Sequence, residues 1–218
     1  MSPDDVEEES PSEEPFLPRR IPIFPLPNVV FFPNMALPLH IFEARYRKMV
    51  TDCLAGDRYL GMMLMKPGWE KGEIEYYEIG GLGLIANVVK HPGGNMDITL
   101  RGLSRYRVKE YLQRTPYLIA DVDILEEEGW EDTPELRRAT GEMLRLFKQT
   151  LYKQDEEFRE GILGQLNLLD SALDITNYLG SILRIKSEMK QQILEASNPA
   201  ERARLLTAIF RGELASLN

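Results

Sequence analysis

The fold is decided in one stretch near the start of the chain, Ile21-Pro-Ile-Phe-Pro-Leu-Pro-Asn-Val-Val-Phe-Phe-Pro-Asn-Met-Ala-Leu-Pro-Leu-His40. It interleaves proline with residues that favour β-structure. Proline has no amide donor and breaks helices, so this stretch cannot be one helix. We predict short extended pieces joined by turns, with the prolines at sheet edges or bulges.

Directly after this stretch the apolar pattern becomes helical. One face of a 3.6-residue repeat is formed by Phe42, Tyr46, Met49, Val50 and Cys53. Gly56 stands where a left-handed C-terminal cap is expected. The pattern predicts the first helix here, with Cys53 on its apolar face, where packing is favoured over a reactive thiol.

Strand signals return after this helix. We predict strands at 59–65, 82–89, 96–100, 106–111 and 117–125. Proline and glycine separate them, and Gly102 is expected to mark a turn. Many short strands around one helix predict a small, partly open barrel or two packed sheets.

The remainder of the chain has helical signals. Thr133-Pro134 is a cap followed by proline at the first helical position, and Asn198-Pro199-Ala200-Glu201 begins the last helix as a cap with Glu three residues on. Between them we predict helices around 156–166, 171–184 and 186–196. The expected class is therefore α+β: a β-rich barrel of short strands with one helix, followed by a C-terminal helical bundle.

Charge is distributed unevenly along the chain. The whole has 26 basic and 35 acidic residues, a formal net charge of -9. The first fifteen residues contain seven carboxylates and no Lys or Arg, and without those seven the body has 26 basic against 28 acidic side chains. We predict an acidic disordered tail over 1–18, a β-rich domain over 19–128 and a helical bundle over 129–218. The balanced body lacks the clustered cations that nucleic acids and anionic membranes attract, so neither is an expected partner.

The location of the protein is also constrained. An acidic N-terminus is the reverse of a secretory signal, which begins with positive charge. No apolar run approaches the roughly 18 residues of a membrane span. The single cysteine, Cys53, excludes an internal disulfide and fits a reducing compartment. We expect a cytoplasmic protein.

Three separated segments resemble the Lon N-terminal domain family. The first runs from Phe24 to Tyr46, and its ending Ile41-Phe-Glu-Ala-Arg-Tyr46 is typical of stand-alone bacterial members. The second, Leu100-Arg-Gly-Leu-Ser-Arg-Tyr-Arg-Val108, is similar to a strand–turn–strand with Arg-Gly at the bend. The third is Lys190-Gln-Gln-Ile-Leu-Glu195 with Asn198 and Arg202 downstream, which is similar to a Lys-Gln-x-x-Leu-Glu segment of the family's helical part.

This resemblance implies a pseudo-barrel related to PUA-type folds, followed by a compact helical bundle. In full-length Lon proteases the region precedes an ATPase and a Ser-Lys protease domain, and it helps to engage substrate proteins. Because the sequence stops after the predicted bundle, we expect a member without those catalytic domains. Asn34 stands where the family often has Gly after Phe-Pro, and Asn tolerates a left-handed backbone, so we expect the same turn.

Catalytic motifs are missing from the sequence. There is no Gly-x-x-x-x-Gly-Lys-Ser/Thr loop for nucleoside triphosphates. Gly81-Leu-Gly-Leu-Ile-Ala86 matches a dinucleotide pattern, but the residues after Ala86 are typical of a strand and turn rather than a helix. Two histidines and one cysteine cannot by themselves complete a four-ligand zinc site. We expect no enzyme activity, no cofactor and no metal.

A long polar connection between strands is the predicted binding surface. It carries Trp69, Tyr76 and Tyr77, and rigid aromatics in loops are common interface anchors. Met62, Met63 and Met65 precede it, and flexible thioethers suit adaptable apolar surfaces. The alternative, that these methionines fill the core and the aromatics cover it, is favoured by the need of alternating strands to bury one face.

The hypothesis drawn from these residues is a non-catalytic module for unfolded or extended polypeptides. Such a module would act as an adaptor, with a protease or chaperone as a further partner. RNA binding is the alternative, because PUA-like barrels include RNA binders, but the charge balance counts against it.

Overall fold

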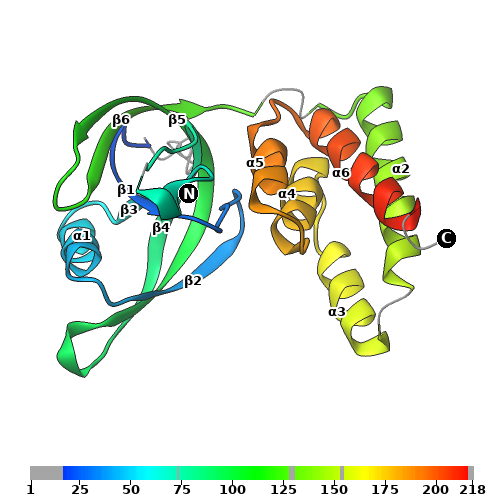
Figure 1. Cartoon of the computed structure of the whole chain (residues 1–218). Helices are drawn as coiled ribbons and strands as arrows, with labels where there is room; N and C mark the ends of the chain where they lie inside the picture. Colours follow the sequence, from blue (N-terminus) through cyan, green and yellow to red (C-terminus); the bar gives the residue numbers. More distant parts are fainter. Residues whose placement is uncertain (1–16, 73, 128–130, 153–154, 216–218) are drawn as a thin grey trace, which may run out of the picture.

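The computed structural model describes residues 17–72, 74–127, 131–152 and 155–215. The six strands and α1 come first and the other five longer helices of the described residues second, and Figure 1 shows the two groups side by side, with α1 on the side of the strands. The strands are β1 (Arg20–Leu26), β2 (Ala36–Ile41), β3 (Tyr59–Leu64), β4 (Ile79–Lys90), β5 (Met96–Gln113) and β6 (Leu118–Leu125). The longer helices are α1 (Ala44–Ala55), α2 (Pro134–Leu151), α3 (Glu156–Leu166), α4 (Ala172–Ile182), α5 (Ser187–Glu195) and α6 (Pro199–Ala215). The predicted α+β class is confirmed. Of the predicted acidic tail, residues 1–16 lie outside the described residues.

The sheet closes on itself. Its order is β2-β5-β4-β3-β1-β6, and an additional pairing of β5 with β6 completes a ring of five strands, with β2 added at one edge of β5. β1 pairs in parallel with β3, and the other pairings are antiparallel. Closure removes the unpaired strand edges of the ring, which is how a small barrel avoids edge-to-edge association.

One predicted turn is wrong. Gly102 lies inside β5, which runs unbroken over the two strands predicted at 96–100 and 106–111. The reason is a close backbone approach: a Cβ at Gly102 would lie 2.4 Å from the carbonyl oxygen of Phe32. The amide of Gly102 also donates to the carbonyl of Met35 at 2.8 Å. Gly102 therefore allows the proline-rich segment to cross the strand, which sequence alone does not distinguish from a turn.

The first helix begins later than predicted. α1 starts at Ala44, and Phe42 lies before it with 60% of its surface exposed. Gly56 is not a left-handed cap, since its φ is −110°. The positive φ falls instead on Arg58, at 66°. The expected left-handed turn at Asn34 is confirmed, with φ of 62°.

Three hydrophobic clusters hold these elements together. One lies beneath α1, one inside the ring and one among the helices of the bundle. Phe31 joins the cluster beneath α1, whereas its neighbour Phe32 is fully buried in the cluster of the bundle. The side chains of these two consecutive residues therefore pack in different clusters, as alternate side chains of an extended chain do. The proline-rich stretch in this way contacts both the barrel and the bundle. None of the helices in the described part of the chain has the length and apolar character that a membrane crossing requires.

Candidate functional site

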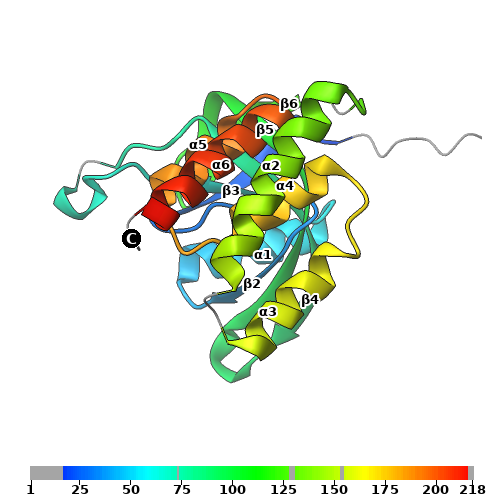
Figure 2. The same ribbon diagram turned by 90° about the vertical axis from the view of Figure 1, so that its right-hand side faces the viewer.

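The connection between β3 and β4 forms a hairpin arm, defined here as the described residues 65–72 and 74–77. Met65 and Tyr76 pair as an antiparallel bridge, and the Lys66 amide donates to the Glu75 carbonyl at 2.8 Å. Gly68 and Gly72 have φ of 105° and 88°, values that favour glycine, and they set the bends on either side of Trp69. Figure 2 shows the arm projecting from the body of the molecule. The predicted aromatics are thus placed on a protruding, locally ordered element.

Trp69 lies on the side of the arm that faces the helices. It lines a small hollow of about 130 Å³ with Pro27 and Met65 from the barrel side and Glu188 from α5. Tyr77 lies near the same helix: burial raises its pKa, and the carboxylates of Glu188 and Glu195 raise it further. Trp69 and Tyr77 are both half-buried, so each presents part of its ring to solvent.

Tyr76 is associated with a different hollow. Its ring centroid lies 6.0 Å from that of Tyr111, and both lie on the barrel side of the arm. The hollow there, about 70 Å³, is also lined by Met65, Ile74 and Arg114. The Arg114 guanidinium lies 4.6 Å above the Tyr111 ring. Trp69 and Tyr76 therefore line two different hollows, Met65 lines both, and Tyr77 lines neither.

Two of the predicted binding residues are core residues. Met62 and Met63 are each 1% exposed, so neither can contact a partner. They lie on β3, which has a strand on each side and a hydrophobic cluster on each face. Met62 packs in the cluster beneath α1 and Met63 packs inside the ring. Assigning them to a binding surface is wrong because both faces of this strand are covered.

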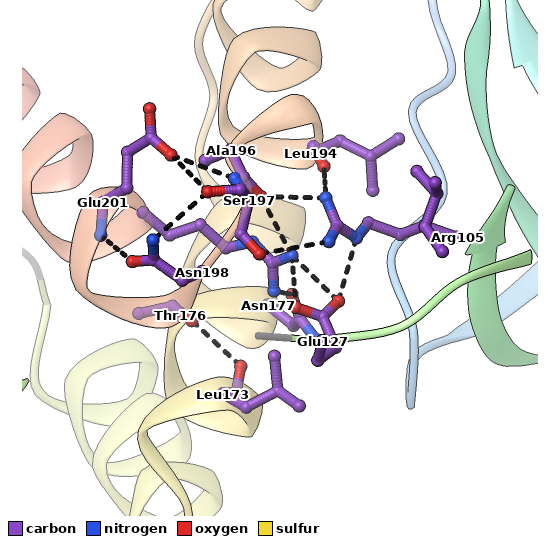
Figure 3. Close-up of polar contacts among 12 residues, drawn as sticks. Arg105, Glu127, Leu173, Thr176, Asn177, Leu194, Ala196, Ser197, Asn198 and Glu201 are labelled. Carbon is purple, nitrogen blue, oxygen red and sulfur yellow. Dashed lines mark hydrogen bonds and ion pairs between the residues drawn. The ribbon is translucent and has the colours of Figure 1, made fainter. Parts of the chain in front are cut away.

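A buried ionic joint connects the barrel to the bundle. Arg105 of β5 donates from Nε to Glu127 at 2.9 Å and from Nη1 to the carbonyls of Leu194 and Ala196, each at 2.8 Å. Arg202 of α6 donates from Nη2 to both oxygens of Glu127 at 2.8 Å. Figure 3 shows the Arg105 guanidinium pointing toward Glu127 and toward the end of α5. The Glu127 carboxylate is thus paired with two buried guanidinium groups. Burial lowers the pKa of Arg105, the nearby charge of Arg202 lowers it further, and Glu127 opposes both.

The two cations of this joint belong to the segments that resemble the Lon family, whereas Glu127 does not. Arg105 lies in the second segment, and Arg202 lies downstream of the third. Gln191, also in the third, donates from Nε2 to the carbonyl of Ile79 at the start of β4. These residues hold two substructures together, and local sequence gave no signal that they would meet.

A surface cluster was also missed by sequence reasoning. The Asp97 carboxylate accepts from Nδ1 of His40 at one oxygen and from Nε2 of His91 at the other, each at 2.6 Å. The hydrogen bonds from both histidines lower the pKa of Asp97. Across the described residues, no group of three or more His, Cys, Asp or Glu side chains is arranged to hold a metal ion.

Comparisons with known proteins agree on one family. A family model described as the ATP-dependent protease La (LON) substrate-binding domain matches residues 20–211. The Lon protease of Dictyoglomus thermophilum is 27% identical over 210 residues, which is 96% of this chain and 26% of that protein. The Lon protease of Syntrophus aciditrophicus is 27% identical over 203 residues, 91% of this chain and 26% of that protein. The chain thus spans about a quarter of the length of these relatives.

Solved structures match the fold. The N-terminal domain of Mycobacterium avium complex Lon protease has a TM-score of 0.72 at 20% identity, covering 88% of this chain and 98% of that one. A Lon N-terminal domain protein from Xanthomonas campestris has a TM-score of 0.64 at 23% identity, covering 87% and 97%. Both similarities include the helical part as well as the barrel, given their coverage.

Proposed function

The chain belongs to the family of the ATP-dependent protease La (LON) substrate-binding domain, and we propose that it binds unfolded or extended polypeptide segments. The substrates of a protease are polypeptides, and a domain that recognises them needs no catalytic group of its own. In this proposal the chain is a non-catalytic adaptor that delivers such segments to a protease or a chaperone.

The observation that carries the proposal is the hairpin arm. Unfolded polypeptides display apolar side chains that folded proteins bury, so a general receptor needs exposed aromatic and flexible apolar groups. The arm supplies Trp69 and Tyr77 on one side and Tyr76 on the other, with Ile74 52% exposed between them in sequence. Met65, whose thioether adapts to differently shaped partners, lines the hollows on both sides.

The test is capture of a permanently unfolded, fluorescently labelled protein, measured by fluorescence anisotropy. Replacing Trp69 and Tyr77 by Ala should weaken capture about tenfold or more, because binding energy concentrates in a few aromatic anchors. The melting temperature should change little, since both side chains are only partly buried. Tyr152→Ala is the matched control, because that ring is 74% exposed and lies on the bundle, away from the arm.

Two results would contradict the proposal. Intact capture with a large fall in melting temperature would mean that the two rings serve only as packing. Failure of wild-type protein to bind any unfolded client would remove the function altogether. A mobility shift with RNA that weakens as salt rises would instead support the RNA-binding alternative.

A further inference from the structure

A cationic hollow lies between α1 and the hairpin formed by β4 and β5. Its volume is about 410 Å³, within the range typical of small-molecule sites in proteins. Figure 1 shows α1 beside this end of the hairpin. Among the described residues that line the hollow are three cations and a histidine, and none is a carboxylate. One face of α1 and the end of the hairpin supply the lining: Ala44, Arg47, Lys48 and Thr51, then Lys90, His91, Gly94 and Met96.

The register of the hairpin directs Lys90 toward α1. Lys90 pairs with Met96, which is buried in the hydrophobic cluster beneath α1. The side chains of a cross-strand pair lie on the same face of a sheet, so Lys90 projects on the face that α1 covers. The next pair, Val89 with Asp97, faces the other way, and Val89 is 56% exposed. The carboxylate of Asp97 is therefore on the opposite face of the hairpin from Lys90.

The guanidinium of Arg47 is positioned by the turn of the hairpin. Its Nη1 donates to the carbonyl of Gly93 at 2.7 Å. Gly94 has φ of 86°, and a Cβ at this position would lie 2.9 Å from the same nitrogen, so a side chain there would displace the guanidinium. Because a guanidinium has five N–H donors, most of them remain for a ligand.

Arg47 and Lys90 are uncompensated charges, since neither forms an ion pair within the part of the chain that the structure describes. Lys48 differs, because its ammonium lies 2.9 Å from Asp52. Two free cations match a dianion, and the planar fork of an arginine suits the oxygens of a phosphate group. So small a cluster fits one phosphate group, whereas a nucleic-acid backbone requires a longer run of contacts.

We propose that this hollow binds a phosphomonoester, with its phosphate group between Arg47 and Lys90 and its organic part against Ala44. The ligand is a free small molecule or a phosphorylated side chain of a polypeptide, and both present the same group. The hollow shares no lining residue with the two hollows of the hairpin arm, so this site is independent of the proposed function.

The probes are inorganic phosphate and free phosphoserine, titrated into the ¹⁵N-labelled full chain at constant ionic strength and pH 7.5, where a phosphomonoester is mostly dianionic. Amide chemical shifts should change saturably around Arg47 and at residues 90–94, with a Kd of about 1 mM or tighter. Lys90→Gln and Arg47→Gln should each weaken binding about tenfold, because each removes a charge-assisted hydrogen bond. Arg107→Gln removes an exposed charge further along β5; it is the matched control and should leave the affinity unchanged.

Two further ligands test the class and the source of the phosphate. Acetate should bind at least about tenfold more weakly than phosphate, and equal binding of acetate would overturn the assignment to phosphate. A serine-phosphorylated peptide that binds more tightly than free phosphoserine identifies a polypeptide as the source, whereas equal affinity identifies a free small molecule.

The site itself would be overturned by either of two results. One is the absence of a saturable shift at residues 90–94 with phosphate and phosphoserine. The other is full affinity in both Lys90→Gln and Arg47→Gln, with melting temperatures equal to that of the wild-type chain. Loss of capture of the unfolded client, with phosphate binding intact, would overturn the proposed function alone.

Discussion

Substitution of Glu127 by Gln isolates the charge at the joint between barrel and bundle. Gln keeps the shape of the side chain but cannot neutralise the two guanidinium groups that meet there. Arg105 is 2% exposed and Arg202 is fully buried, so both cations would remain out of water without a carboxylate. The free energy of unfolding should fall because the folded state then carries two uncompensated buried charges.

The loss in free energy of unfolding depends on which hydrogen-bond partners each guanidinium keeps in the Glu127→Gln variant. Removing one partner of a buried ion pair costs about 3–5 kcal/mol. Arg105 retains the carbonyls of Leu194 and Ala196 as acceptors, and the side chain of Glu127 is 17% exposed, so the lower end of that range applies. At about 2–4 °C per kcal/mol for a chain of this size, a loss of about 3 kcal/mol lowers the melting temperature by about 6–12 °C.

Urea and thermal unfolding monitored by circular dichroism at neutral pH measure this change. The matched control is Glu135→Gln, which breaks the exposed pair with Arg204 and should cost at most about 1 kcal/mol. Adding Arg105→Met to Glu127→Gln should recover part of the loss, because one of the two unpaired cations is removed. If Glu127→Gln were no more destabilising than the control, the Glu127 carboxylate would not stabilise the fold by neutralising Arg105 and Arg202.

Four other predictions have direct measurements. Burial raises the pKa of Cys53 to about 12, so iodoacetamide at pH 8 should label it only after unfolding, and rapid labelling of the native protein would contradict this. Gly102→Ala should cost about 1–3 kcal/mol in urea, because its methyl group meets the backbone of Phe32, whereas Gly141→Ala, with open space around it on α2, should not destabilise the chain. Removal of residues 1–16 should change the free energy of unfolding by about half a kcal/mol or less, and a loss above about 2 kcal/mol would show that they are a packed part of the fold. Purified chain should hydrolyse neither ATP nor casein, and turnover that survives removal of host proteases would refute the absence of a catalytic site.

Local signals in the sequence located most of the elements. The Thr133 cap is present, with its Oγ1 accepting from the Leu136 amide at 3.1 Å, and the Asn198 side chain accepts from the Glu201 amide at 2.9 Å. Caps and apolar periodicity are properties of a few consecutive residues, which is why they can be recognised without a structure. Gly102 was misassigned because its requirement for glycine comes from Phe32, a residue seventy positions earlier in the chain.

The candidate site was only partly predictable for the same reason. The polar, turn-rich sequence around Trp69 identified an exposed connection, but it could not show that Trp69 and Tyr76 line different hollows. Met62 and Met63 were wrongly assigned to the binding surface. Their strand, β3, lies between β4 and β1, and this position in the sheet depends on strands distant in the sequence. Glu127 lies in a run of three acidic residues that is typical of a solvated loop, and only the folded chain brings it to Arg105 and Arg202.

The hairpin arm and the ionic joint both contact α5. The arm ends at Tyr77, two residues before Ile79, and the Ile79 carbonyl accepts from Gln191 of α5 at 2.8 Å. Glu188 on the same helix lines the hollow that contains Trp69. The carbonyls at the end of α5, at Leu194 and Ala196, are in turn held by Arg105. Because one short helix borders the hollow and is bonded to the joint, we expect the position of the bundle to set the shape of the proposed polypeptide site. A displaced bundle would then open the hollow even with every residue of the arm intact.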